Sequence, residues 1–340
     1  MRDTMAQAVE LAESGKRFCL AVVVGKSGSA PQIPGAKGLF LEDGQVIGTI
    51  GGGCLEMEAR RLGLLAIHTG QPAVHEFRLN DDFGWDDGLI CGGRVEVLLA
   101  PRPEDYVDAF RQAVRDRARG VLCFDLESGK AMFHADDTQQ EHVDGFATAL
   151  RTKRQVRSEH RYVEPVLPPE RLIVFGAGHI GRQIAQQGSL LGFHVTIVDD
   201  RPEFVTEERV PFAHERVCEI PQSYAASLET DQDTYVCLVT RGHRNDARCL
   251  RELIGKPVAY LGMIGSKRKR EVVRQEMIAE GLCSEAQFER VKCPMGLDVG
   301  AETVDEIAVS IAAELVQIRA SRRGPILARC TPRAVAATSD

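Results

Sequence analysis

The feature that most constrains the fold of this chain is a glycine pattern that directly follows an apolar run. Residues 176–181 read GAGHIG, which has the form GxGxxG, and a second apolar run downstream ends at Asp199. In this setting Gly176 permits a tight turn, Gly178 lets the backbone approach a diphosphate, and Gly181 allows a helix to pack closely. The helix N-terminus attracts the diphosphate, and Asp199 is placed to accept a hydrogen bond from a ribose hydroxyl. The pattern predicts a nucleotide-type site, and the same glycines also fit a purely structural role.

Strand-like and helix-like segments alternate along the second half of the chain. Their order is RLIVFG, HIGRQIAQQGSLLG, HVTIVD, TYVCLVT, DARCLRELIG, PVAYLGMIG and KRKREVVRQEMIAEG. Alternation of this kind is typical of a doubly wound parallel sheet. A capping-box pattern from Thr303 to Glu306 begins a final helix with apolar residues at helical spacing. The sequence therefore predicts an α/β protein with a C-terminal Rossmann-like domain.

The beginning of the chain has a different pattern of short strands and helices. Apolar runs at 18–24 and 94–99 predict strands, and residues 55–66 place apolar side chains on one helical face. Asp43-Gly44, between two apolar segments, is a strong signal for a hairpin with a type I′ turn. These features predict a smaller N-terminal α+β domain.

The expected domain boundaries follow from these changes of pattern. The N-terminal domain is predicted at 1–100 and the Rossmann-like domain at 165–322. Between them, 101–164 is a less distinct middle segment or linker in which one helix and two short strands are expected. Residues 323–340 form a tail.

Charge and cysteine content exclude several classes of protein. The formal net charge is −7, which argues against a general nucleic-acid or anionic-membrane binder. No apolar run approaches the roughly 18 residues of a membrane-spanning helix, and residues 1–15 do not form a signal-peptide core. The 10 cysteines include no CxxC pair, so neither a disulfide framework nor a zinc knuckle is expected. We therefore expect a cytoplasmic protein.

One cysteine in the first domain is a candidate functional thiol. Gly51, Gly52 and Gly53 precede Cys54 at a strand-to-helix turn, where backbone N–H groups bind anions and favour a thiolate. Cys91 is also followed by two glycines, and if the two glycine turns meet, the thiols form a pair near a ligand. Cys91 fits equally well as a small residue packed in the interior.

Two further candidates follow the next strand of the second domain. Arg241 and His243 are expected at the carboxyl end of that strand, the edge where open α/β sheets bind ligands, and are candidates to contact an anion. Asn245 or Asp246 is expected to cap a helix that starts at Ala247, which is a structural role.

Other polar residues are expected at helix starts of the same domain. Ser266 and Lys267 follow a glycine and begin a basic helix, a combination that suits a phosphate cradle as well as a solvated surface. His179 lies inside the glycine motif, where an imidazole can hydrogen-bond a ligand or simply be solvated. No catalytic residue is certain from the sequence: Cys54 and Cys91 are candidate thiols, His243 is a candidate acid/base group, and no second catalytic group with a fixed partner can be named.

Taken together, the motifs resemble the XdhC/CoxI family, the accessory proteins of xanthine dehydrogenase. In the first domain the resemblance rests on GSAPQIPGAKG, IGTIGGGCLE and CGGRVEVLL. In the second it rests on VEPVLPPERLIVFGAGHIG, VDDRPEF, RGHRND, YLGMIGSKRK and PMGLDVGAETVDEIAVSIAAEL. The motifs span about 18–100 and 163–319, and their order is highly specific.

The resemblance implies a cofactor-binding chaperone and not an enzyme in its own right. Such a protein binds molybdenum cofactor (molybdopterin), supports its sulfuration together with a cysteine desulfurase, and delivers it to apo xanthine dehydrogenase or a related molybdenum hydroxylase. In this reading Cys54 is a candidate ligand beside molybdenum, because soft sulfur suits exchange of a labile ligand. The resemblance also implies that Gly176, Gly178 and Gly181 bind cofactor. It gives Cys91, His179 and His243 as further candidates.

Several alternatives stay open at this point. The nucleotide site suits NAD(P), another nucleotide, or the nucleotide end of a dinucleotide form of the molybdenum cofactor. An NAD(P)- or nucleotide-dependent oxidoreductase with His243 as its acid/base group is the main competing function, and a regulatory scaffold is a third. A homodimer is expected from the apolar final helix and the exposed hairpin edge.

Overall fold

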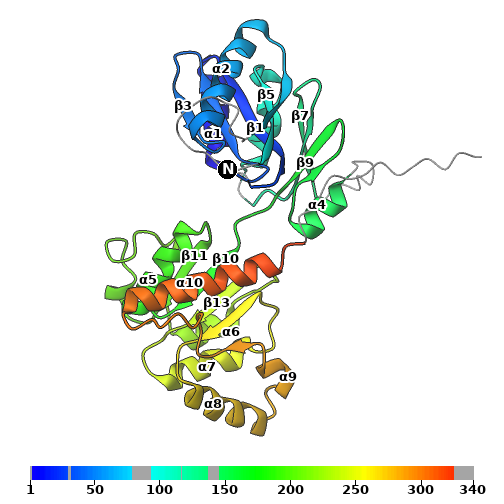
Figure 1. Ribbon diagram of the computed structural model, residues 1–340. Helices are drawn as coiled ribbons and strands as arrows, with labels where there is room; N and C mark the ends of the chain where they lie inside the picture. Colours follow the sequence, from blue (N-terminus) through cyan, green and yellow to red (C-terminus); the bar gives the residue numbers. More distant parts are fainter. Residues whose placement is uncertain (1, 30–31, 79–92, 116, 137–144, 325–340) are drawn as a thin grey trace, which may run out of the picture. The chain divides into compact units, whose positions relative to one another are not determined.

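The computed structural model describes residues 2–29, 32–78, 93–115, 117–136 and 145–324. It divides the chain into two compact units: unit 1 is Met1–Pro168 with Arg323–Asp340, and unit 2 is Pro169–Arg322 (Figure 1). Within the described ranges, no helix combines the length and the apolar character needed to cross a bilayer.

Unit 1 begins with a five-stranded sheet in the order β3-β2-β1-β5-β4, with antiparallel neighbours. The strands are β1 (Phe18–Ser27), β2 (Lys37–Leu41), β3 (Val46–Gly48), β4 (Ala73–Arg78) and β5 (Arg94–Ala100), and the helices are α1 (Arg2–Glu13) and α2 (Gly53–Thr69). Successive side chains of β1 pack on opposite faces of the sheet. Leu20 belongs to the hydrophobic core that includes α1, and Ala21 belongs to the core that includes α2. The sheet is therefore buried on both faces, which explains why β1 reads as a continuous apolar run.

A second sheet of unit 1 has the order β7-β6-β9-β8. Its elements are η2 (Pro103–Asp105), α3 (Val107–Ala113), β6 (Gly120–Asp125), β7 (Ala131–Ala135), α4 (Phe146–Thr152), β8 (Val156–Arg157) and β9 (Arg161–Val166). Phe124 and Tyr162 of this sheet share one hydrophobic core with Phe18 of β1. The segment expected as a linker at 101–164 therefore belongs to the compact N-terminal unit, which differs from the boundaries that the sequence suggested.

Unit 2 is a six-stranded parallel sheet in the order β12-β11-β10-β13-β14-β15. The strands are β10 (Arg171–Phe175), β11 (His194–Asp199), β12 (Glu215–Cys218), β13 (Thr234–Leu238), β14 (Tyr260–Met263) and β15 (Val291–Lys292). The helices are α5 (His179–Leu190), η3 (Pro202–Phe204), α6 (Pro221–Ser227), α7 (His243–Leu253), α8 (Lys267–Ala279), α9 (Glu285–Phe288) and α10 (Val304–Ser321). Counted from β10, the order is 3-2-1-4-5-6, the Rossmann order. The predicted α/β class with a Rossmann-like domain is confirmed.

Separate cores cover the two faces of this parallel sheet. Ile184 of α5 and Ile311 of α10 belong to one core, and Leu250 of α7 and Met277 of α8 belong to the other. The predicted capping box of the last helix is confirmed, because the Thr303 hydroxyl accepts a hydrogen bond from the Glu306 N–H.

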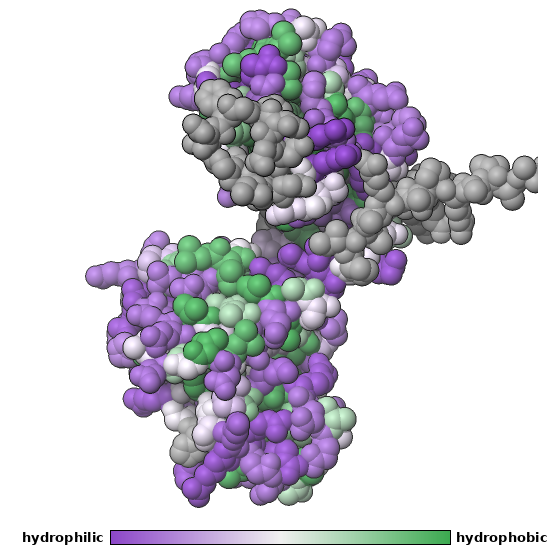
Figure 2. Space-filling view, in the orientation of Figure 1, coloured by the Kyte–Doolittle hydropathy of each residue, from purple (hydrophilic) through white to green (hydrophobic). Residues whose placement is uncertain are grey.

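The outward side of α10 also carries apolar residues. Val309 and Val316 are 53% and 42% exposed, and Figure 2 shows apolar atoms gathered over the region where Figure 1 draws this helix. The homodimer expected from the sequence stays a prediction.

The hairpin of unit 1 is confirmed, but its predicted turn type is wrong. β2 and β3 pair across the Asp43-Gly44 turn, and Gly44 has a φ of 89°. A type I′ turn needs positive φ at both central residues, and Asp43 does not have it. Its carboxylate instead accepts a hydrogen bond from the Gln45 N–H at 2.9 Å, which stabilises a turn with a single left-handed residue.

Candidate functional site

The turn before α2 presents Cys54 at the start of a helix. Gly51, Gly52 and Gly53 have φ values of 135°, 68° and 58°, which side chains rarely adopt, and Cys54 is the second residue of α2. Glu56 fixes the turn, because its carboxylate accepts hydrogen bonds from the Thr49 hydroxyl at 2.7 Å and the Ile50 N–H at 3.1 Å. The half-buried thiol therefore lies among N–H groups that have no acceptor within the helix.

Cys91, the second candidate thiol, lies outside the described residues, so its pairing with Cys54 stays a prediction. The residue two positions later, Gly93, is described and is tightly packed. A Cβ on Gly93 would lie 2.0 Å from the carbonyl oxygen of Ser29. Gly93 thus lies against the loop that follows β1.

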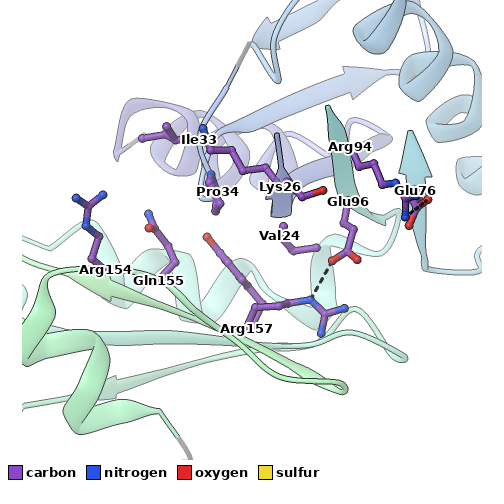
Figure 3. Close-up of a pocket in the computed structure, with 13 residues that line it drawn as sticks. Val24, Lys26, Ile33, Pro34, Glu76, Arg94, Glu96, Arg154, Gln155 and Arg157 are labelled. Atoms are coloured by element: carbon purple, nitrogen blue, oxygen red, sulfur yellow. Dashed lines mark ion pairs between the residues drawn. The ribbon is translucent and has the colours of Figure 1, made fainter. Parts of the chain in front are cut away.

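A cavity of about 580 Å³ lies within unit 1 and is drawn in Figure 3. We call it the unit 1 cavity. Its walls come from the end of β1 and the loop after it, from β4 and β5, from the segment around β8, and from β9. The charged lining residues are Lys26, Glu76, Arg94, Glu96, Arg154 and Arg157. The register of β1 against β5 shifts between Val23 and Gly25, and such bulges commonly turn side chains toward functional sites. A cavity of this size accommodates a small organic ligand.

Two of the four cations in the unit 1 cavity have carboxylate partners. Arg157 Nε lies 3.5 Å from Glu96 Oε2, and Arg94 Nη1 lies 3.8 Å from Glu76 Oε1 (Figure 3). Lys26 and Arg154 form no ion pair with any residue that the structure describes, although Arg154 Nε donates a hydrogen bond to the Gly324 carbonyl at 3.0 Å. The lining therefore has more positive than negative charge.

A buried ion pair adjoins one wall of the cavity. Lys37 Nζ lies 2.5 Å from Glu164 Oε1, and these side chains are 1% and 8% exposed. Tyr162, which lines the cavity, donates a hydrogen bond from its hydroxyl to Glu164 at 3.4 Å. Burial, and then the adjacent carboxylate, raise the pKa of Tyr162 well above its ordinary value. The phenol is therefore a neutral hydrogen-bonding group.

In unit 2 the structure distinguishes the three glycines of the motif. A Cβ on Gly176 would lie 2.4 Å from the Val239 carbonyl oxygen, and one on Gly181 would lie 1.8 Å from the Gly176 carbonyl oxygen. Gly178 differs, because its Cβ would meet no atom within 4 Å. Only Gly178 therefore leaves space open before the N-terminus of α5. His179, the first residue of that helix, is exposed beside it.

Asp199 is the last residue of β11, as expected, but its carboxylate already accepts several hydrogen bonds. Arg201 Nε and Nη2 lie 2.8 and 2.9 Å from its two oxygens, and the Ala177 N–H donates at 2.7 Å. Burial alone raises the pKa of Asp199, but the hydrogen bonds from Arg201 and Ala177 lower it, and the net pKa lies below its ordinary value. The Arg201 guanidinium also stacks on Phe204, with its Cζ 3.6 Å from the ring centroid. Ribose binding by Asp199 stays a prediction, and it requires Arg201 to move.

The remaining predicted residues lie after β13 and β14. Helix α7 begins at His243 with Gly242 as its N-cap, so the predicted cap at Asn245 or Asp246 is wrong. Arg241 is exposed next to this start, and the His243 side chain lies outside what the structure describes.

The predicted hydroxyl cap of α8 is confirmed. Ser266 accepts a hydrogen bond from the Lys269 N–H at 3.2 Å, and Lys267 is exposed. An ion pair beside this cap was not predicted from the sequence: Lys269 Nζ lies 2.7 Å from the buried Asp246, which also accepts from the Thr240 hydroxyl at 2.6 Å. This pair ties α7 and α8 together at the carboxyl edge of the sheet.

The open position of Gly178 gives a direct test of nucleotide binding. We expect Gly178→Ala to change the free energy of unfolding by less than about 1 kcal/mol, because its φ is −67° and no atom lies in the way. We expect affinity for ADP or CDP, measured by titration calorimetry, to fall about tenfold or more, because a methyl group keeps the diphosphate away from the helix N-terminus. Equal affinities in the variant and the wild type would contradict a diphosphate site at this turn.

Comparison with known proteins adds a family assignment. The family model of the XdhC Rossmann domain matches residues 172–315, and the family model named XdhC and CoxI family matches residues 11–78. A protein of Bacillus subtilis (strain 168), described as a probable subunit of xanthine dehydrogenase, is 24% identical over 322 residues, which is 91% of this chain and 95% of that protein. The molybdenum cofactor insertion chaperone PaoD of Escherichia coli (strain K12) is 23% identical over 321 residues, 94% of this chain and 88% of that protein.

A solved structure supports the same fold. The crystal structure of a xanthine dehydrogenase from Bacillus halodurans matches with a TM-score of 0.77 and 24% identity, and the match covers 94% of this chain and 96% of that chain. At this level of identity the likeness concerns the fold. The two family matches fall in the two structural units, one in each. The chain belongs to the XdhC and CoxI family.

Proposed function

We propose that this chain is an accessory protein for the maturation of a xanthine dehydrogenase or a related molybdenum hydroxylase, and that it binds molybdenum cofactor and delivers it to the apo-enzyme. The observation that carries this proposal is the similarity to PaoD, a molybdenum cofactor insertion chaperone, over 94% of this chain. A match of that length includes both units.

The residues of unit 1 fit such a cofactor. Molybdenum cofactor brings a pterin, a dithiolene and a phosphate, so its binding protein needs cationic groups and polar contacts. The unit 1 cavity offers four cations against two carboxylates, and Cys54 offers a thiol at a helix N-terminus in the same unit. Soft thiolate sulfur suits a molybdenum centre whose terminal ligand is exchanged, and this favours Cys54 as the residue that acts during sulfuration by a cysteine desulfurase.

If Cys54 contacts the molybdenum, a substitution at this position reduces cofactor retention without affecting folding. We expect Cys54→Ser to change the free energy of unfolding by less than about 0.5 kcal/mol, because the side chain is only half-buried and the substitution is nearly isosteric. We expect the molybdenum retained after gel filtration to fall about tenfold, in line with the loss of a metal contact. Cys218→Ser is the matched control, because Cys218 is an exposed thiol in unit 2. A large loss of thermal stability in Cys54→Ser would identify this thiol as a packing residue instead.

Delivery is tested by activating an apo-hydroxylase. The apo-enzyme is mixed with chain that has been loaded with sulfurated molybdenum cofactor, and its activity is followed with time. We expect loaded chain to activate the apo-enzyme faster than the same amount of free cofactor, because a bound cofactor is protected until transfer. Equal rates with and without the chain would contradict the proposal.

The Rossmann unit supports a second ligand of nucleotide type. The open space at Gly178 before α5 favours a diphosphate there, either the nucleotide end of a dinucleotide cofactor or a separate nucleotide such as NAD(P). Both oxygens of the Asp199 carboxylate already accept hydrogen bonds from Arg201, which argues against direct recognition of a ribose diol. Nucleotide binding is therefore proposed to displace Arg201. An oxidoreductase function with His243 as its acid/base group is the competing proposal, and His243 begins α7 at the carboxyl edge of the sheet.

A further inference from the structure

We propose that the unit 1 cavity recognises a phosphorylated heterocycle, and that Lys26 and Arg154 hold its phosphate. This inference deepens the proposed function, on which it rests, by assigning the phosphate-bearing pterin to the unit 1 cavity and its phosphate to Lys26 and Arg154, neither of which was a candidate from the sequence. Three features of the cavity support it: its charge, the chemistry of its walls and the rigidity of the shell around it.

The cavity carries positive charge that its own carboxylates do not compensate. Arg94 and Arg157 already face the carboxylates of Glu76 and Glu96, and Glu76 also pairs with Arg78 at 3.1 Å. Lys26 has no ion-pair partner among the described residues, and Arg154 donates its hydrogen bond to a neutral carbonyl. Figure 3 shows the Lys26 side chain extended toward the side of the cavity on which Arg154 and Gln155 lie.

Cations that line one cavity repel one another, and Lys26 and Arg154 have no ion-pair partner among the residues that the structure describes. Lys26 comes from β1 and Arg154 from the segment between α4 and β8, and both line the same cavity. A dianionic phosphate removes this repulsion and adds charge-assisted hydrogen bonds, which are among the strongest in proteins. Arg and Lys are also the side chains that most often bind phosphate groups.

The uncharged part of the wall suits a flat heterocycle. Val24, Ile33 and Pro34 give the cavity an apolar side, and Ile33 remains 52% exposed. The Gln155 amide offers both a donor and an acceptor, which is what the edge of a pterin or another nitrogen heterocycle requires. The volume of about 580 Å³ lies within the range of ordinary ligand pockets.

The shell behind the cavity holds these groups in place. A Cβ on Gly35 would lie 2.9 Å from Gln155 Nε2 and 3.3 Å from the Tyr162 hydroxyl oxygen, so the backbone here approaches both side chains closely. Lys37 donates a hydrogen bond to the Gly35 carbonyl at 3.1 Å and pairs with Glu164. The wall that carries Gln155 and Tyr162 is thus anchored by a buried ion pair, as a preorganised binding site requires.

Fluorescent pterins test the assignment directly on the full chain. The probes are neopterin 3′-phosphate, unphosphorylated neopterin and inorganic phosphate, with binding followed by fluorescence anisotropy for the pterins and by calorimetry for phosphate. We expect Lys26→Gln and Arg154→Gln each to weaken binding of neopterin 3′-phosphate about tenfold, the effect of losing one charge-assisted contact, and to leave neopterin unaffected. Arg154→Lys, which keeps the charge, is expected to retain most of the affinity.

Matched controls separate the cavity from general surface charge. Lys16→Gln and Arg151→Gln remove the same side chains from exposed positions of unit 1 that do not line the cavity, and we expect both to bind like the wild type. Equal binding of neopterin 3′-phosphate by all variants, or no binding by the wild type, would overturn the assignment. Inorganic phosphate that binds as tightly as neopterin 3′-phosphate would overturn the heterocycle part of it.

Failure of this inference is distinguishable from failure of the proposed function. If wild-type chain activates the apo-hydroxylase while the cavity variants bind the probe equally well, the cavity assignment is overturned and the proposed function stands. If the probe pattern is as expected but loaded chain gives no activation, the cavity assignment stands and the delivery function is overturned.

Discussion

Replacing Glu164 with Gln is expected to lower the free energy of unfolding of unit 1 by about 3–5 kcal/mol, the usual effect of removing one partner from a buried ion pair. Lys37 and Glu164 are 1% and 8% exposed, and they join β2 of the first sheet to β9 of the second. Gln leaves the Lys37 ammonium buried without an opposite charge, which is the reason for the large effect. The measurement is urea denaturation of the full chain, with hydrogen exchange in β2 and β9 assigning the transition to unit 1.

Two controls accompany Glu164→Gln. Glu58→Gln breaks the ion pair with Arg61 on α2, whose side chains are 37% and 64% exposed, and is expected to change stability by less than about 1 kcal/mol. The double variant Lys37→Met/Glu164→Leu removes both charges and is expected to recover most of the lost stability. A loss below about 1 kcal/mol in Glu164→Gln, similar to that in Glu58→Gln, would contradict the buried charge as the cause.

The second large effect is expected from Gly181→Ala in unit 2. The new Cβ would lie 1.8 Å from the Gly176 carbonyl oxygen and 3.2 Å from a methyl group of Val239. Because the closest atom belongs to the backbone, no rotamer change relieves the clash, and α5 must move away from the sheet. We expect a loss of about 3 kcal/mol or more in the stability of unit 2, at or beyond the upper end for overpacked cores.

Gly178→Ala serves as the matched control within the same motif. It adds the same methyl group three residues away, where no atom lies within 4 Å. Thermal and urea unfolding of the two variants are compared with the wild type, with hydrogen exchange in β10 and β13 reporting on unit 2. If Gly181→Ala were as stable as Gly178→Ala, the close approach of α5 to the turn after β10 would be wrong.

Local sequence patterns predicted unit 2 well, because its fold is built from signals that are close together in the chain. The GxGxxG turn lies between a strand and the helix that follows it, and the Thr303 capping box marks where α10 begins. The turn before α7 shows the limit of such reasoning. Asp246 looked like a helix cap, but its carboxylate accepts hydrogen bonds from Thr240 and Lys269, and the second of these contacts comes from a distant segment.

The second sheet of unit 1 and the unit 1 cavity could not be predicted in the same way. β6 pairs with β9, although β7, α4 and β8 lie between them in the chain, and the core they form includes residues of β1. No local periodicity therefore indicates that 101–164 joins the N-terminal unit. The cations of the cavity come from three separate parts of the chain, near 26, 94 and 154–157. The weak signals that were available are the basic stretch RTKRQVR at 151–157 and the position of Arg94 just after the Cys91 segment.

Cofactor content is the most direct test of the central claim, that this chain binds molybdenum cofactor. Purified full-length chain is incubated with released molybdenum cofactor and passed through gel filtration, and pterin and molybdenum are then measured in the protein fraction for the wild type and Cys54→Ser. We expect close to one pterin and one molybdenum per chain in the wild type, with molybdenum lost from the variant. Absence of pterin from both proteins would contradict the claim and leave nucleotide binding by unit 2 as the function to pursue.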